Sequence, residues 1–237
     1  MGVPVPDAPN DMTHITLINP NTSKHTTAMM TEIARGLLPP GVTIDGVTAE
    51  RGVPMIIDDR QLAASVAGVV EMGLAAASRS DGIIISAFGD PGIDQLRPLV
   101  DIPVVGICEA GMLEASKGGR RFGIATVTPD LVASFSSKAI GLGLGHLYTG
   151  TRLTPDDPLE LASNAIALED ALAITVQQSF ELDGAEAVII GGGPLGQAAV
   201  GLAPRFKIPV IAPISTAVEQ LLRHMADRSG NMREACS

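Results

Sequence analysis

An internal repeat constrains the fold of this chain more than any other feature. The sequence GIIISAFGDPG, which begins at Gly82, resembles AVIIGGGPLG, which begins at Ala187, about 105 residues later. Likewise, ITLINPNTS at Ile15 resembles FGIATVTPD at Phe122. Any two strand–helix–strand units look partly alike, but each strand of the first pair is also followed by IPV after a similar spacing. The repeated IPV therefore favours two related lobes.

Short aliphatic runs alternate with longer, alanine-rich segments, a pattern typical of parallel sheets covered by helices. We expect strands at residues 14–18, 43–48, 82–86, 103–107, 121–126, 146–151, 187–191 and 209–211. We expect helices at residues 23–36, 60–78, 92–99, 110–117, 130–139, 165–183, 196–203 and 214–226. The predicted fold class is α/β, with two pseudo-symmetric lobes that each hold a mainly parallel sheet flanked by helices.

The repeat also suggests how the chain divides. Residues 13–119 form the first predicted lobe, and residues 120–209 form the second. The C-terminal segment 210–227 is a candidate to be exchanged into the first lobe. Residues 1–12 and 228–237 are expected to be flexible tails. In this arrangement the ends of equivalent strands face each other across a cleft, where ligands of open α/β sheets bind. Ala87 then corresponds to Gly192, and Asn21 to Thr128.

Composition argues against several function classes. Sixteen Lys and Arg against 26 Asp and Glu give a net charge of −10 without a basic patch, and six aromatic residues are few for base stacking, so we expect no nucleic-acid partner. Apolar runs fall short of the roughly 20 residues that cross a bilayer, and no secretory signal is visible, so we expect a cytoplasmic protein without a membrane partner. Two cysteines and four dispersed histidines predict neither a disulfide framework nor a local metal motif.

Two strand ends carry hydroxyl and amide side chains. Residues 19–23 (NPNTS) end a predicted strand and open a helix, and residues 126–130 (TVTPD) repeat this arrangement. Plain helix capping explains such sequences without any function. Two such ends facing one cleft would also hold a carboxylate or carbonyl oxygen through backbone and side-chain donors. The candidate oxygen-binding residues are Asn21, Thr22, Ser23, Thr126 and Thr128.

Acid–base candidates are few. Asp90 in FGDPG is either a general base or the cap of the helix that follows it, and Glu109 is either a second acid–base group or a favourable charge at a helix start. Cys108 lies in an apolar stretch and is read as a buried small residue rather than a nucleophile. Residues 191–194 (GGGP) form a turn that lets a ligand approach the backbone, although they match no known phosphate-binding motif.

Taken together, INPNTS, FGDPG, IPVVGICEA and the glycine turn resemble the aspartate/glutamate racemase superfamily, specifically its hydantoin and allantoin racemase branch. The resemblance covers residues from about 14 to 226. It implies a cofactor-independent enzyme, with no metal, that acts on a small molecule between two α/β lobes. It also implies a homo-oligomer.

Members of this family place one cysteine on each face of the acidic carbon of the substrate. The matching positions hold Ala87 and Gly192, so ordinary two-thiol racemisation should fail. Three explanations stay open: an engineered change at Ala87; an isomerase, lyase or hydrolase that uses Asp90, Glu109 or an ordered water; or a homologue that binds a hydantoin-like, cyclic-amide or carboxylate ligand without turnover. The expected substrate-binding residues are Asn21, Thr22, Ser23, Ala87, Phe88, Thr126, Thr128, Gly192, Gly193, Pro194 and Leu195.

Overall fold

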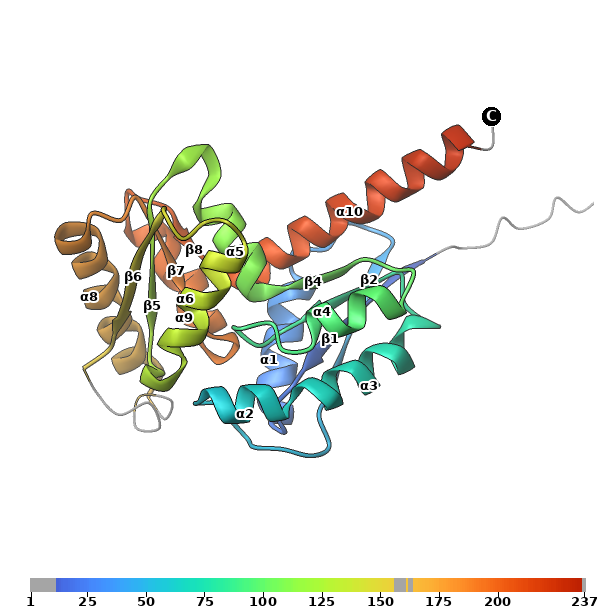
Figure 1. The fold of residues 1–237 in the computed structure, drawn as a ribbon, viewed down its shortest axis with the longest axis horizontal. Coiled ribbons are helices and arrows are strands. Elements are labelled where there is room, and N and C mark those ends of the chain that lie inside the picture. The colour runs from blue at the N-terminus through green and yellow to red at the C-terminus, as the bar shows by residue number, and fades with distance from the viewer. Residues whose placement is uncertain (1–11, 156–160, 162–163, 236–237) are drawn as a thin grey trace, which may run out of the picture.

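The computed structural model describes residues 12–155, 161 and 164–235, which contain two four-stranded parallel sheets (Figure 1). The first has the order β2-β1-β3-β4 and the second the order β6-β5-β7-β8. Their strands are β1 (Thr13–Asn19), β2 (Val42–Thr48), β3 (Gly82–Ile85), β4 (Val104–Gly106), β5 (Phe122–Thr126), β6 (Tyr148–Leu153), β7 (Ala187–Ile190) and β8 (Val210–Ile211).

The sequence repeat is matched by the pairing of the strands. Ile15 lies opposite Gly82 in the β1–β3 pair, and Phe122 lies opposite Ala187 in the β5–β7 pair. The two central strand pairs therefore have the same register, because the repeated residues occupy equivalent rungs. This finding confirms the predicted fold class of two pseudo-symmetric α/β lobes.

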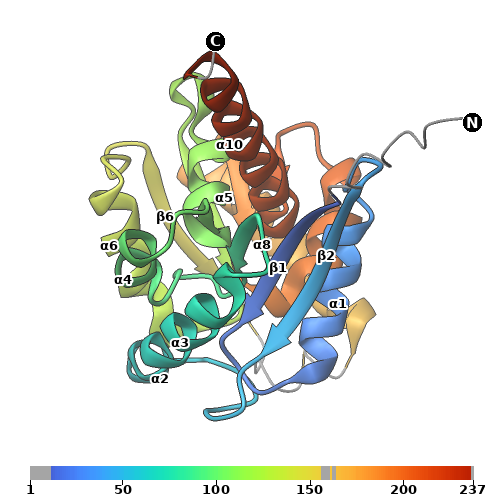
Figure 2. The same cartoon turned by 90° about the vertical axis from the view of Figure 1, so that its right-hand side faces the viewer.

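Helices cover the sheets, and Figure 2 shows β1 and β2 side by side with α1 and α3 on opposite sides. The α-helices are α1 (Lys24–Arg35), α2 (Asp59–Ala64), α3 (Val66–Ala77), α4 (Ile93–Leu96), α5 (Ile107–Ala115), α6 (Val132–Gly141), α8 (Ala165–Asp183), α9 (Gly196–Leu202) and α10 (Pro213–Ala235). Short 3₁₀ turns span Arg97–Leu99, Lys117–Gly119, Pro129–Leu131, Gly193–Leu195 and Ala203–Arg205. None of the described helices combines the length and the apolar character that a membrane span requires.

Three predicted helices differ from the structure by more than small shifts at their ends. The helix expected at 60–78 is divided at Ser65, whose hydroxyl donates to the carbonyl of Leu62 and so competes with regular helix bonding. The helix expected at 110–117 begins at Ile107, because a carboxylate from another loop satisfies its first N–H groups. The last helix, α10, continues to Ala235 and extends beyond the body of the molecule (Figure 1).

The largest hydrophobic core joins the two lobes. It combines apolar residues of β1 and β3 with those of β5 and β7, and it includes α5 and α10, which lie side by side (Figure 2). Two glycines permit this close packing: a Cβ at Gly82 would lie 2.9 Å from the side chain of Leu221, and one at Gly111 would lie 3.3 Å from Ile189. Both lobes are thus held against the same pair of helices, which fixes the cleft between their strand ends.

Candidate active site

A cavity lies where the segments after β1 and β3 meet the segments after β5 and β7. Its volume is about 40 Å³. It is lined by Asn21, Met55, Ile56, Leu62, Ser86, Ala87, Phe88, Val127, Thr128, Leu131, Phe135, Gly191, Gly192, Gly193, Pro194 and Leu195. Eight of the eleven predicted substrate-binding residues are in this lining, and Thr22, Ser23 and Thr126 are not.

Asn21 is held by hydrogen bonds centred on Asn19, which no sequence pattern predicted. The amide nitrogen of Asn19 donates to Asn21 Oδ1 at 2.9 Å and to Thr27 Oγ1 at 2.9 Å, while Asn19 Oδ1 accepts the N–H of Asn21. Asn21 Oδ1 also accepts the N–H of Ser23 at 2.9 Å. The oxygen of Asn21 is therefore engaged, and its NH₂ group, which has no partner among the described residues, is the part left for a ligand.

Ser23 and Thr126 do not line the cavity, but their hydroxyl groups hold the backbone segments beside it. Ser23 caps α1, where its hydroxyl oxygen accepts the N–H of Thr26. Thr126 Oγ1 donates to the carbonyl of Gly191 at 2.6 Å, which ties β5 to the glycine turn. A hydroxyl has one hydrogen, so the 3.2 Å contact between Thr126 and Thr128 is donated by Thr128. The lone pairs of the Thr128 hydroxyl then remain available to accept a hydrogen bond.

Ala87 and Gly192 both line the cavity, as their equivalent positions in the two lobes require. The three glycines of the turn differ in how tightly they are packed. A Cβ at Gly191 would lie 2.7 Å from Ile124, and one at Gly193 would lie 2.6 Å from the carbonyl oxygen of Ser86. The three atoms nearest to a Cβ at Gly192 all belong to the side chain of Leu195, the nearest at 3.1 Å, so that side chain would have to move by a few tenths of an ångström. The backbone at Gly192 is extended, a conformation that residues other than glycine also adopt.

Asp90 does not reach the cavity. Its side chain is fully buried, and its carboxylate accepts the N–H groups of Cys108 and Glu109, each at 2.8 Å. Gly106 makes room for it, since a Cβ there would lie 2.2 Å from the carboxyl carbon. The prediction that Asp90 caps the helix after it is wrong, because Gly92 occupies that position and Asp90 instead caps α5. Asp90 has a left-handed φ of 50°, which is uncommon for a residue other than glycine.

The pKa of Asp90 is raised to about 6, because burial disfavours its charge more than Lys138 and the two N–H groups favour it. Lys138 Nζ comes from α6 of the second lobe and lies 3.1 Å from Asp90 Oδ2. The N–H of Asp90 also donates to the carbonyl of Ala87 at 3.0 Å, which closes the turn that presents Ala87 and Phe88. Asp90 therefore shapes the cavity wall and links the lobes.

Glu109, the other predicted acid–base residue, is part of the same buried cluster. It pairs with Arg97 and lies 3.7 Å from Lys138 Nζ, and it does not line the cavity. Cys108 beside it is fully buried, and burial raises the pKa of its thiol. The structure brings these residues together but away from the cavity, so it does not support catalytic contact by Asp90 or Glu109.

The wall of the cavity contains several residues that sequence patterns did not single out. Phe88 of the first lobe and Phe135 of the second form an edge-to-face contact with ring centroids 5.0 Å apart. Met55 and Ile56 come from an irregular loop that carries no motif. None of the lining residues has an ionisable side chain. Among the residues that the structure describes, no group of three or more His, Cys, Asp or Glu could hold a metal ion.

The model of the Asp/Glu/Hydantoin racemase family matches residues 15–221. The chain belongs to this family. This match confirms the predicted superfamily, and the relatives that follow confirm the predicted branch. Hydantoin racemase of Paenarthrobacter aurescens is 25% identical over 86% of this chain and 87% of its own length. Hydantoin racemase of Rhizobium meliloti is 28% identical, with coverages of 87% and 86%. Allantoin racemase from Klebsiella pneumoniae superposes with a TM-score of 0.85 at 29% identity, over 90% of this chain and 88% of that one.

Membership in the racemase family supports an enzyme of the racemase and isomerase class that acts on a small molecule. This member places alanine and glycine, at Ala87 and Gly192, on the two strand ends that enclose the cavity. Neither side chain can carry a proton.

Proposed function

We propose that the protein is a cofactor-independent isomerase that acts on a small hydantoin-like cyclic amide without a thiol pair. One observation carries the choice of substrate: the cavity offers the NH₂ of Asn21 as a donor and the hydroxyl oxygen of Thr128 as an acceptor. An amide has the complementary pair, since its carbonyl accepts from Asn21 and its N–H donates to Thr128. A carboxylate offers Thr128 no hydrogen.

Water replaces the thiols in this proposal. Ala87 and Gly192 line the cavity without a group that could carry a proton, and in this proposal one water molecule acts beside each of them. A water molecule on one face takes the proton from the acidic carbon, and the electron pair moves onto the neighbouring carbonyl to form an enolate. The NH₂ of Asn21 stabilises that oxygen. A water molecule on the opposite face returns a proton to the carbon, which inverts its configuration. The hydroxide ion left there is neutralised through solvent by the hydronium ion formed on the first face, so the composition of the substrate does not change.

A second candidate is a homologue that binds such a ligand without turnover. It is favoured by the absence of an ionisable side chain among the residues that line the cavity. A cytoplasmic location and a homo-oligomeric state, both expected from the sequence, stay part of either proposal.

Proton NMR in deuterium oxide with 5-methylhydantoin tests the proposal. We expect the ring C–H signal to be lost faster with the protein than in the blank, and the Asn21→Ala and Thr128→Val variants to abolish the difference. Ligand-induced thermal stabilisation without faster exchange would instead establish the second candidate.

A paired variant, Ala87→Cys with Gly192→Cys, separates the cleft from its chemistry. We expect it to exchange the proton faster than a matched Ala87→Ser with Gly192→Ser control, because a thiol ionises far more readily than a hydroxyl. If neither pair nor the unaltered protein binds 5-methylhydantoin, the proposed substrate class is refuted.

A further inference from the structure

Two contacts between the lobes join the same two short segments of the chain. The first is the edge-to-face contact of Phe88 with Phe135, and both of these residues line the cavity. The second is the ion pair between Asp90 and Lys138, with 3.1 Å between Oδ2 and Nζ. Asp90 comes two residues after Phe88, and Lys138 follows Phe135 on α6. The two segments therefore meet twice, once at the cavity wall and once outside the cavity.

Short, hydrogen-bonded backbone connects the two contacts within each segment. The N–H of Asp90 donates to the carbonyl of Ala87 at 3.0 Å, which closes a tight turn that contains Phe88. Phe135 and Lys138 are three residues apart on α6, a spacing that places both side chains on the same face of a helix. A displacement at the ion pair is therefore transmitted to the aromatic pair, because neither connection contains a flexible joint.

Lys138 has two carboxylate neighbours, which compete for its ammonium group. Glu109 Oε2 lies 3.7 Å from Nζ, slightly farther away than Asp90 Oδ2. Glu109 also pairs with Arg97, so it has a cation of its own whatever the charge of Asp90. When Asp90 is neutral, the ammonium group of Lys138 loses its ion pair and retains the attraction to Glu109. Protonation of Asp90 therefore changes the forces on α6 at the position of Lys138.

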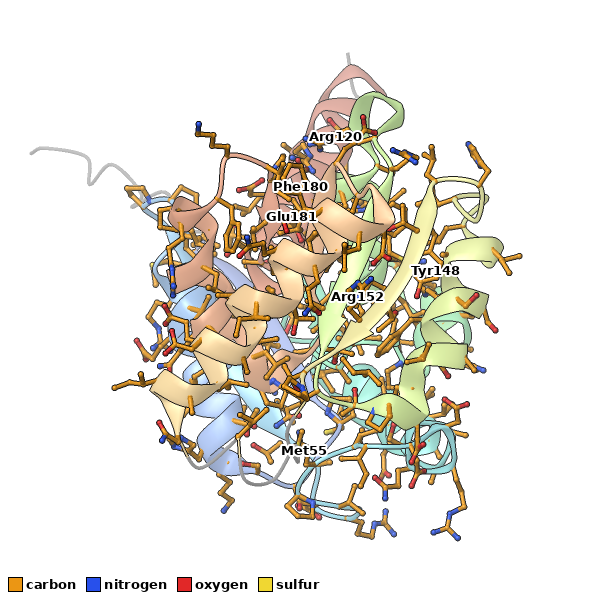
Figure 3. The ribbon with its side chains drawn as sticks, turned by 90° about the vertical axis from the view of Figure 1, so that its left-hand side faces the viewer. Met55, Arg120, Tyr148, Arg152, Phe180 and Glu181 are labelled. Atoms are coloured by element: carbon orange, nitrogen blue, oxygen red, sulfur yellow. The ribbon has the colours of Figure 1, made fainter. Side chains whose placement is uncertain are left out.

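Asp90 changes its charge close to neutral pH. Its pKa is raised to about 6, since burial disfavours the carboxylate more than its partners favour it. The charged and titratable groups that face Asp90 or its neighbours are Lys138, Glu109, Cys108, Arg97 and Tyr148. Figure 3 shows Tyr148 on β6, beside α6. Burial raises the pKa of both Cys108 and Tyr148, so these two groups stay neutral while Asp90 titrates.

We infer that Asp90 and Lys138 are a positioning pair, whose ionic contact holds the aromatic wall of the cavity in the geometry that binds a cyclic amide. Neither residue lines the cavity, and each acts through the phenylalanine of its own segment. The inference rests on the proposed function, because it takes a cyclic amide to bind in this cavity. The affinity for that ligand should therefore rise with pH through the titration of Asp90, since only the ionised carboxylate forms the pair.

The aromatic wall can be followed by NMR without a ligand, in the full chain labelled with carbon-13 in its phenylalanine rings. Phe88→Leu and Phe135→Leu variants assign the two signals of the wall. We expect the nuclear Overhauser effect between these two rings to be weaker at about pH 5 than at about pH 7, and weak at both pH values in Lys138→Met. The contact between Phe122 and Tyr148, with ring centroids 5.7 Å apart within the second lobe, is the internal control and should not change.

Calorimetric titration with 5-methylhydantoin, which is uncharged at both pH values, tests the effect on binding. We expect the unaltered protein to bind it about fivefold more tightly at about pH 7 than at about pH 5. Lys138→Met should bind it equally weakly at both, whereas Lys138→Arg keeps the positive charge and should restore the difference. The matched control Lys117→Met removes an exposed lysine that pairs with Glu114, and it should retain the fivefold difference.

The results distinguish a failure of the positioning pair from a failure of the proposed function. The four histidines titrate in the same range, but their effect would persist in Lys138→Met. If 5-methylhydantoin binds and its pH dependence persists in that variant, the positioning pair is refuted while the proposed function stands. An equal Overhauser effect between Phe88 and Phe135 at both pH values would also refute the pair. If 5-methylhydantoin binds at neither pH, the proposed function fails, and the ring-to-ring effect still decides whether the ion pair holds the wall.

Discussion

Lys138 is the residue whose removal tests the buried link between the lobes most directly. Its ammonium group lies 3.1 Å from Asp90 and 3.7 Å from Glu109, and its side chain is 18% exposed. A Lys138→Met variant keeps most of the aliphatic stem and removes the charge. Asp90 would then retain only the two backbone N–H groups at the start of α5 as partners for its carboxylate.

Removing one partner of a buried ion pair typically costs about 3–5 kcal/mol, because the other charge is left uncompensated. Two N–H donors still stabilise the carboxylate of Asp90, and the slight exposure of Lys138 admits some screening. We therefore expect the variant to lower the free energy of unfolding by about 2–3 kcal/mol at about pH 8.

The loss should depend on pH. Because the pKa of Asp90 is raised to about 6 in the folded protein, the folded state binds this proton more tightly than the unfolded state does. The contribution of Asp90 to stability is therefore full below about pH 4 and falls as the pH rises through about 6. Lys138 lowers the pKa of Asp90, so removal of Lys138 raises that pKa and extends the loss of stability to higher pH. Each unit of that change adds about 1.4 kcal/mol to the loss above the titration range.

Urea unfolding followed by circular dichroism at about pH 5 and pH 8 measures both effects. The matched control is Lys117→Met, which removes a lysine that is 55% exposed and pairs with Glu114. The control should change the free energy of unfolding by less than about 0.5 kcal/mol. If Lys138→Met behaves like the control, or loses the same stability at both pH values, the buried link does not act as described.

Three further predictions concern the cavity and its supports. A Gly193→Ala variant should lower stability by about 1–3 kcal/mol, because the new Cβ would lie 2.6 Å from the Ser86 carbonyl, whereas Gly192→Ala should change the melting temperature little. An Asn19→Ala variant should lose about 2–3 kcal/mol in denaturant unfolding, since the NH₂ contacts with Asn21, Ser23 and Thr27 and the acceptor for the Asn21 N–H all disappear. It should also weaken 5-methylhydantoin binding, and unchanged affinity would mean that Asn21 holds its position without these contacts. Cys108 should remain unmodified by iodoacetamide in the native protein and react after denaturation, as peptide mass spectrometry would show, because its thiol is buried and its pKa is raised.

The sequence by itself determined the architecture of this protein. Repeated strand and turn sequences predicted two equivalent lobes, and the observed pairing of Ile15 with Gly82 and of Phe122 with Ala187 follows the same repeat. These features are readable because apolar periodicity and turn residues act over short stretches of chain. The sequence also identified Ala87 and Gly192 as the two residues that would lie at equivalent strand ends.

Only the tertiary structure decided what the polar residues do. The sequence predicts Asp90 as a general base or a cap of the next helix, yet it caps a helix that begins 17 residues later in the chain, next to Gly106. Its partner Lys138 comes from the other lobe and belongs to no motif, and Met55 reaches the cavity from an irregular loop. Contacts of this kind depend on how distant segments pack, and local patterns do not encode such packing.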